Sequence, residues 1–155
     1  MKNKIHTIEV ENNETQSVEK IIEKIRDNKI IYVKNKFYED KDVLDSITEN
    51  GPAIILNSSG SSGKPRKCFH HLDNLKLSAF TSGQWLIEQG FELQNCLILN
   101  TLPLNHISGL MPIFRSQTWG CDCINISPNL IKKTRELLLF TIKSKKNKKH
   151  LITSL

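Results

Sequence analysis

The sequence predicts an α/β fold with a largely parallel sheet. Short apolar runs of strand length alternate along the chain with longer segments in which apolar residues recur at helical spacing. This alternation is typical of strands joined by crossover helices. The chain has 155 residues, which suits one domain with its own core or a piece of a larger domain.

The first elements are a helix, a strand, a second helix and another strand. Val18, Ile21, Ile22 and Ile25 fall on one helical face, and Ser17 stands where an N-cap is expected. The further elements predicted before residue 57 are a strand at 30–33, a helix through 43–47 that ends at the breaker 50–52, and an apolar strand at 53–56.

The later elements repeat this alternation. A helix is expected from Asp73, its predicted N-cap, to Glu88, and Gly90 ends it. Pro112 is compatible with the first turn of a later helix over residues 110–119. The other elements expected are strands at 96–99, 121–126 and 150–155, a loop at 102–108 and a helix at 130–142.

The sequence predicts neither a membrane-spanning protein nor a secreted disulfide scaffold. No apolar run reaches the roughly 18 residues of a spanning helix. The first residues contain no apolar region of a signal peptide, and the four cysteines lack zinc-finger spacing. We therefore interpret the cysteines as reduced and structural, expect no metal site, and expect a cytoplasmic location.

The net charge of +6 is local. Residues 1–50 carry 9 basic and 11 acidic side chains, whereas the last 25 residues carry 8 basic and 1 acidic. Most of the excess is the lysine run at 143–149, which has no interleaved aromatic residues. We interpret this run as a solvated loop and rank nucleic-acid binding well below the alternatives given below.

The most informative stretch is the loop expected at 57–67, directly after the apolar strand. Its glycines allow backbone N–H groups to converge on an anion, and its hydroxyls and cations suit phosphate oxygens. It is not a P-loop, because the spacing of its glycines is too short and Pro65 follows Lys64. A plain Gly/Ser linker is the simpler alternative, although apolar segments flank the loop closely on both sides. The candidate phosphate-binding residues are Ser58, Ser59, Gly60, Ser61, Ser62, Gly63, Lys64 and Arg66.

This stretch, together with Leu102-Pro103-Leu104-Asn105-His106-Ile107-Ser108-Gly109-Leu110, resembles two motifs of the adenylate-forming enzymes. These are the phosphate loop and the acyl-pocket motif of acyl-CoA synthetases, luciferases and peptide-synthetase adenylation domains. The two motifs stand in the family's order and at a typical separation, and Asn74 fits an Asn of the family pattern. Within the superfamily, the run after His106 and the compact N-terminal part look most similar to o-succinylbenzoate–CoA ligases of menaquinone or phylloquinone biosynthesis.

The resemblance implies ATP-dependent adenylation of a carboxylic acid, followed by thioester formation with CoA. The loop would hold the β- and γ-phosphates of ATP, and His106 would help to place the substrate carboxylate, with a partly buried structural histidine as the alternative. Mg²⁺ is implied by the family, but no ligands for it are found in this chain. Arg66 and Lys67 stand where the family usually has Lys and Gly, and Asn105 replaces a usual aromatic.

The resemblance covers residues 53–155 and divides the chain at residue 50. Residues 1–50 would form a short N-terminal α/β part, and residues 51–155 an incomplete AMP-binding domain. The adenine-binding, hinge and catalytic-lysine regions of the family would all lie after Leu155, so we expect an N-terminal fragment that is inactive alone and lacks a C-terminal half. The alternative is a non-catalytic module that binds phosphate or a partner protein.

Overall fold

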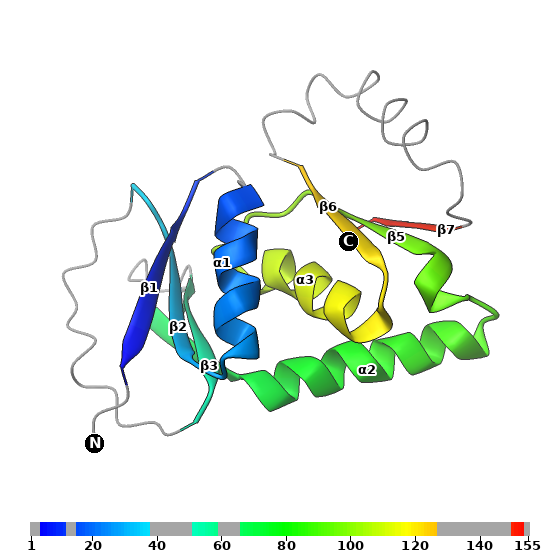
Figure 1. Ribbon diagram of the computed structural model, residues 1–155, viewed down its shortest axis with the longest axis horizontal. Coiled ribbons are helices and arrows are strands. Elements are labelled where there is room, and N and C mark those ends of the chain that lie inside the picture. Colours follow the sequence, from blue (N-terminus) through cyan, green and yellow to red (C-terminus); the bar gives the residue numbers. More distant parts are fainter. Residues whose placement is uncertain (1–3, 12–14, 38–50, 59–65, 127–149, 154–155) are drawn as a thin grey trace.

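The computed structural model describes residues 4–11, 15–37, 51–58, 66–126 and 150–153. It is an α/β structure with two sheets and three long helices (Figure 1). The first sheet consists of β1 (Ile5–Val10), β2 (Ile30–Asn35), β3 (Ala53–Ser58) and β4 (Arg66–His71), in that spatial order. β1, β2 and β3 are parallel, and β4 returns antiparallel to β3.

The second sheet has the order β6-β5-β7 and is parallel throughout. Its strands are β5 (Cys96–Asn100), β6 (Asp122–Asn125) and β7 (His150–Thr153), and the short 3-10 helix η2 (Leu93–Asn95) precedes β5. The prediction of an α/β fold with a largely parallel sheet is confirmed, although the strands are divided between two sheets.

Three helices pack on and between these sheets. α1 (Thr15–Arg26) packs on β1 and β2, α2 (Leu72–Glu88) follows β4 directly, and α3 (Ile107–Trp119) packs against α2, β5 and β6. In Figure 1, α1 and α3 lie between the two sheets and α2 runs along beneath them. Among the described residues, no helix is both long and apolar enough to cross a membrane.

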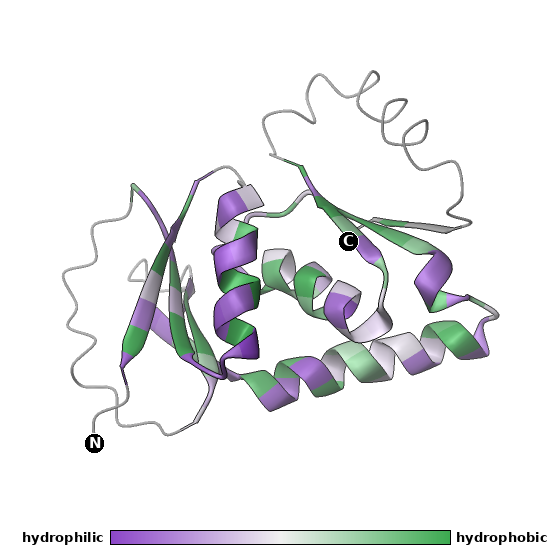
Figure 2. Ribbon diagram, viewed as in Figure 1, coloured by the Kyte–Doolittle hydropathy of each residue, from purple (hydrophilic) through white to green (hydrophobic). Residues whose placement is uncertain are grey.

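The apolar runs of β2 and β3 are continuous because both faces of these strands are buried. Ile31, Val33, Ile54 and Leu56 point into the main core, which also contains residues of α1, α2 and α3. Their neighbours Ile30, Tyr32 and Ile55 form a smaller cluster on the other face of the same sheet. Figure 2 shows the matching pattern on α1, where hydrophobic and hydrophilic stripes alternate.

Two predicted N-caps are wrong. α1 begins at Thr15, so Ser17 lies inside the helix, where it is buried and its hydroxyl donates to the Glu9 carbonyl at 3.5 Å. α2 begins at Leu72 because β4 runs straight into it, and Asp73 lies in the first turn, where a carboxylate interacts favourably with the helix dipole. The position of Gly90, whose φ is +85°, agrees with its predicted role at the end of α2.

The boundaries of α3 and of the loop at 57–67 also differ from the predictions. α3 begins at Ile107, so Pro112 lies in its second turn, where its missing N–H leaves the Ser108 carbonyl without the usual helical donor. The predicted elements include neither β1 nor β4, and the pairing of β4 with β3 converts both ends of the expected loop into a hairpin. The helices expected at 43–47 and 130–142 and the lysine run at 143–149 lie outside the described residues.

Candidate functional site

The first half of the candidate site is the hairpin of β3 and β4. Ser58 and Arg66 are paired across it, so the two ends of the connection 59–65 lie side by side at the carboxyl end of β3. Ser58 is half-buried and Arg66 is exposed. The candidate residues Ser59, Gly60, Ser61, Ser62, Gly63 and Lys64 lie outside the described part of the chain.

Tyr32 of β2 supports the hairpin close to its connection. Asn57 is paired with Lys67, the Asn57 amide donates to the Tyr32 hydroxyl at 2.8 Å, and the Lys67 ammonium lies 5.7 Å from the centre of the Tyr32 ring. The Tyr32 side chain is buried at 2% exposure, so it provides a fixed support for both residues. Lys67 thus carries its charge next to Arg66, at the point where the connection returns to the sheet.

The second half of the site is the segment between β5 and α3, residues 101–106. The backbone N–H of His106 donates to the Pro103 carbonyl at 3.1 Å, which closes a turn. The His106 carbonyl then accepts from Gly109 and Leu110 at 3.0 and 3.1 Å, so His106 is the N-cap residue of α3. Its side chain makes no capping hydrogen bond and is exposed, which leaves the imidazole available to a ligand.

Gly109 is required where the segment folds back on itself. A Cβ atom at this position would lie 2.0 Å from the Pro103 carbonyl oxygen and 2.7 Å from that of Leu102. Both neighbours are backbone atoms, so no side chain could move aside to make room. The glycine of this segment therefore has a packing reason in this chain: α3 must begin in contact with the turn that carries His106.

One core cluster contains a residue close to each of the two motifs. Leu56, two residues before Ser58, and Leu104, two residues before His106, both belong to the main core cluster, at 3% and 0% exposure. Both segments follow the carboxyl ends of parallel strands, which is where open α/β sheets bind their ligands. Of the candidate residues, the structure describes Ser58, Arg66 and His106. Ser58 ends β3, Arg66 lies across the hairpin from it, and His106 lies in the segment that follows β5.

The described part of the hairpin has cationic groups for phosphate but no carboxylate for a metal. The described hairpin residues next to the connection are Asn57, Ser58, Arg66 and Lys67, and none is a carboxylate. Mg²⁺ prefers carboxylate and other oxygen ligands, so it does not fit this donor set. The described residues also contain no group of three or more His, Cys, Asp or Glu side chains that could hold a metal ion.

The cysteines and His70 have no assigned role at the candidate site. All four cysteines are free, and burial, with a smaller contribution from Cys121, raises the pKa of the Cys123 thiol to about 12. A thiol of such pKa is protonated at neutral pH and is a poor nucleophile. Burial lowers the pKa of His70 on β4 below its usual value.

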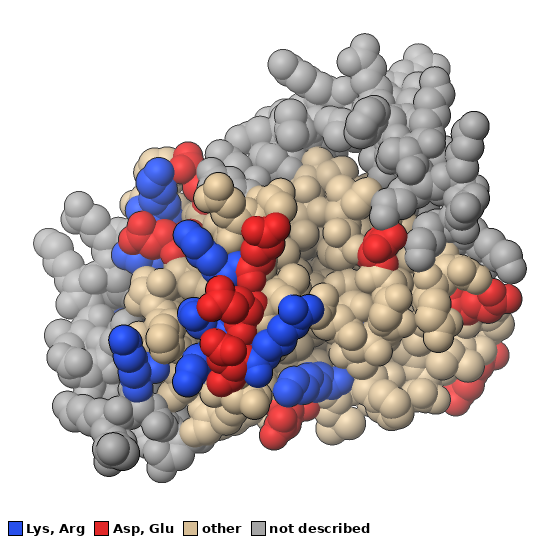
Figure 3. All heavy atoms as spheres, viewed as in Figure 1, with Lys and Arg blue, Asp and Glu red and all other residues tan. Residues whose placement is uncertain are grey.

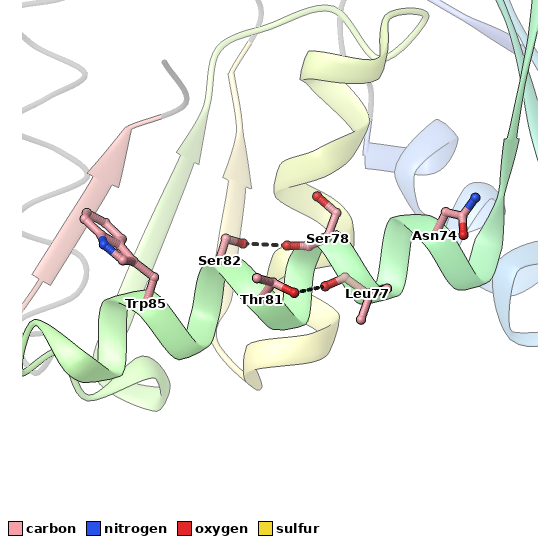
Figure 4. Close-up of a pocket in the computed structure, with 6 residues that line it drawn as sticks. All are labelled: Asn74, Leu77, Ser78, Thr81, Ser82 and Trp85. Atoms are coloured by element: carbon pink, nitrogen blue, oxygen red, sulfur yellow. Dashed lines mark hydrogen bonds between the residues drawn. The ribbon is translucent and has the colours of Figure 1, made fainter.

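Two hollows of the surface lie away from this site. One runs along the outer face of α2, and Figure 4 shows its lining residues, which are Asn74, Leu77, Ser78, Thr81, Ser82 and Trp85. The hydroxyls of Thr81 and Ser82 donate to carbonyls of their own helix at 3.0 Å, so they are not directed at a common ligand. The other hollow is lined by residues at the amino ends of β1, β2 and β3, opposite the hairpin connection.

Charges are unevenly distributed over the surface. Figure 3 shows Lys and Arg interleaved with Asp and Glu over α1 and the first sheet, whereas the described surface beside the second sheet carries few basic groups. Several of these charges are paired, as in Lys34 with Glu9 at 3.0 Å and Lys36 with Glu11 at 3.1 Å. The described surface in this view is therefore a mixed one rather than a basic face.

Sequence reasoning missed the residues that hold the site from behind. The sequence places Tyr32 only in a predicted strand and Asn57 only in a predicted loop. Asn100 is not among the predicted site residues, although it ends an apolar run directly before a Pro-containing loop. A polar residue at the carboxyl end of a buried strand is a signal that could have found it.

Comparison with known proteins supports the fold. No protein-family model and no curated protein matches the sequence. Among solved structures, o-succinylbenzoate coenzyme A synthetase from Bacillus subtilis in complex with AMP is 17% identical, with a TM-score of 0.55, over 92% of this chain and 47% of that chain. The same enzyme in complex with ATP and a magnesium ion is 15% identical, with a TM-score of 0.56, over 98% and 50%. McyG A-PCP complexed with phenylalanyl-adenylate is 16% identical, with a TM-score of 0.52, over 97% and 32%.

At this level of identity the likeness concerns the fold. The chain spans at most about half the length of the proteins it matches. Over that length it has the fold of the adenylate-forming enzymes.

Proposed function

We propose that this chain is part of an acid–CoA ligase that activates a carboxylic acid with ATP, in the cytoplasm. In this reaction the substrate carboxylate attacks the α-phosphate of ATP, and an acyl-adenylate and pyrophosphate are formed. The thiol of CoA then attacks the acyl carbon, and AMP leaves. The substrate we propose is o-succinylbenzoate, which would place the enzyme in menaquinone or phylloquinone biosynthesis.

One observation carries this proposal: the hairpin connection and the His106 segment both follow carboxyl ends of parallel strands, and Leu56 and Leu104, two residues before Ser58 and His106, belong to one core cluster. The likeness in fold to o-succinylbenzoate coenzyme A synthetase supports the same reading.

The candidate residues have separate roles in the proposed reaction. Ser58 and Arg66, with Ser59, Gly60, Ser61, Ser62, Gly63 and Lys64 between them, would hold the β- and γ-phosphates and stabilise the leaving pyrophosphate. Lys67 would add positive charge at the same end of the hairpin. The exposed imidazole of His106 would orient the substrate carboxylate towards the α-phosphate.

The family also implies Mg²⁺ bound with ATP. Since the described hairpin residues include no carboxylate, ligands for Mg²⁺ would have to come from elsewhere, and none of the roles above depends on the metal.

Exchange of labelled pyrophosphate into ATP is the direct test. The intact product from its natural source, supplied with o-succinylbenzoate, is expected to catalyse this exchange, and the 155-residue chain alone is not. In the intact product, Arg66→Ala should raise the KM for ATP about tenfold to a hundredfold, because a charge-assisted hydrogen bond to phosphate is lost. Lys29→Ala, a change of the same kind at the amino end of β2, is the matched control and should leave the KM unchanged.

Other results would overturn the proposal. Exchange that is independent of any carboxylic acid would exclude an acid ligase. An intact product of 17.8 kDa that binds pyrophosphate through Arg66 but exchanges none would instead favour the non-catalytic phosphate-binding module.

A further inference from the structure

Asn100, the last residue of β5, is the one fully buried amide side chain among the described residues. Its exposure is 0%, and only two other polar residues, Ser17 and Ser116, are buried to a comparable degree in the described core. A buried carboxamide costs free energy unless its donors and acceptor are bonded. Its hydrogen bonds therefore show what holds it in the core.

Three hydrogen bonds join this side chain to three different parts of the chain. Its Nδ2 donates to the Gly109 carbonyl and to Asn125 Oδ1, each at 2.7 Å. Its Oδ1 accepts from the backbone N–H of Leu102 at 3.2 Å. The partners fix the orientation of the amide, because a backbone N–H must face the oxygen and a backbone carbonyl must face the nitrogen.

These bonds close the segment that carries His106 at both ends. Leu102 stands near the start of the segment, and Gly109 lies in the first turn of α3, just after it. Between them, His106 is held by its own backbone bonds to Pro103, Gly109 and Leu110. The absence of a side chain at Gly109 lets α3 start against this turn, within reach of Asn100.

The side chain of Asn125 and the backbone N–H of Ile126 complete the support from β6 and the residue after it. Asn100 is paired with Asn125 in the parallel sheet, and the Asn100 carbonyl accepts from the Ile126 N–H at 2.8 Å. These bonds fix the Asn100 amide relative to the second sheet, and the amide in turn holds the segment. The imidazole of His106, in the same turn, is exposed.

From these contacts we propose that Asn100 is a positioning residue that holds segment 101–106 closed and thereby sets the place of His106 for the substrate carboxylate. This inference rests on the proposed function for its catalytic consequence, but the closure of the segment can be measured without it. Asn100 touches no substrate in this proposal and acts through the backbone on either side of His106.

The test compares Asn100→Asp with Asn125→Asp. Both substitutions replace an amide by a carboxylate of the same shape, at opposite ends of one hydrogen bond. Asn125→Asp keeps an oxygen that can accept from Asn100 Nδ2, whereas Asn100→Asp places an oxygen against the Gly109 carbonyl and breaks the closure. The pair Asn100→Ser and Asn125→Ser repeats the comparison without a buried charge, in case Asn100→Asp does not fold.

The first readout is amide hydrogen exchange in the 155-residue chain. Exchange at His106 and Gly109 should become about tenfold faster or more in the Asn100 variants, relative to the amides of β2 in the same protein. The Asn125→Asp control should change it less than about twofold. Unchanged exchange at His106 and Gly109 in both Asn100 variants would overturn the proposal.

The second readout is the kinetics of acid-dependent pyrophosphate exchange in the intact product. In the Asn100 variants His106 should lose its position, which should raise the KM for the acid about tenfold or more. The KM for ATP should change by less than about threefold. If both KM values rose by similar factors and kcat fell as well, Asn100 would be a structural residue only, and the positioning role would be wrong. If the unaltered product exchanged no pyrophosphate with any acid, the proposed function would fail, while amide exchange would still decide whether Asn100 closes the segment.

Discussion

At the residue scale, Gly109 shows how a motif position is set by backbone contact. Three backbone atoms of Leu102 and Pro103 lie within 2.7 Å of the place where its Cβ would be. The carbonyl of Gly109 meanwhile accepts from Asn100 in the core. Any side chain would push α3 away from the turn at 103–106 and lengthen that hydrogen bond.

Gly109→Ala is therefore expected to lower the free energy of unfolding by about 3 kcal/mol or more, despite the better helix propensity of alanine. Urea unfolding followed by circular dichroism would measure the loss. Ser108→Ala, at the exposed neighbouring position, is the control and should change stability by less than about 0.5 kcal/mol. Equal stability of both variants would show that the turn and α3 are not in contact.

Other residues of the site show why single positions are hard to predict from the sequence. His106 could be selected as a candidate because the segment around it resembles the acyl-pocket motif of the adenylate-forming enzymes. Tyr32 and Asn57 could not, since their hydrogen bond joins positions 25 residues apart on different strands. Such a contact depends on the register between β2 and β3, and no local pattern in the sequence determines that register.

At the element scale, α2 and α3 are joined by a close crossing that uses the indole of Trp119. The indole N–H donates to the Ala79 carbonyl at 2.7 Å, and the side chain is buried at 6% exposure. Gly83 makes this possible, because a Cβ there would lie 2.6 Å from the indole nitrogen. Since His106 is the N-cap residue of α3, this contact also fixes the helix that carries the candidate site at its start.

The two tryptophans of the chain offer a matched pair for this contact. Trp119→Phe should cost about 1–2 kcal/mol of stability, because it removes one buried hydrogen bond and part of the packed ring. The Ala79 carbonyl keeps the Ser82 hydroxyl as a donor at 3.0 Å, which limits the cost. Trp85→Phe changes a side chain that is 59% exposed on the outer face of α2 and should be nearly neutral.

Thermal unfolding followed at 222 nm would measure both variants without depending on tryptophan fluorescence. A larger loss in Trp85→Phe than in Trp119→Phe would contradict the packing described for α2 and α3.

Strands that are buried on both faces could be predicted from the sequence. The strands at β2, β3 and β5 are continuous apolar runs, and their existence follows from burial on both faces. β4 was missed because its sequence, RKCFHH, is mostly polar and lies at the edge of the sheet, where one side needs no apolar neighbour. Helix starts were misplaced because α2 and α3 follow a strand and a turn without a side-chain cap, so the capping signal was absent.

At the scale of the whole molecule, one core joins parts of the chain that the sequence divides at residue 50. β2 and β3 pair across that division, and the main cluster contains residues from Ile8 to Phe114. The fold class could be predicted because it depends on the alternation of elements. The division of the strands between two sheets could not, because it depends on which strands find partners over long separations.

The unity of this core gives the last prediction. Ile21 on α1 and Ile113 on α3 are buried at 0% and 1% exposure and belong to the same cluster. Replacement of either by alanine should cost about 2–5 kcal/mol. If the described part unfolds as one cooperative unit, each change should lower the hydrogen-exchange protection of β2 in the first sheet and of β5 in the second by the same free energy.

Leu77→Ala, at a position that is 62% exposed on α2, is the control and should leave both sheets unchanged. A loss of protection confined to the first sheet in Ile21→Ala, and to the second sheet in Ile113→Ala, would mean that the two sheets open separately. In that case the hairpin at Ser58 and Arg66 and the segment at His106 would not be held in a fixed relation. The proposed joint action of the two motifs on ATP and the acid would then need another part of the protein to align them.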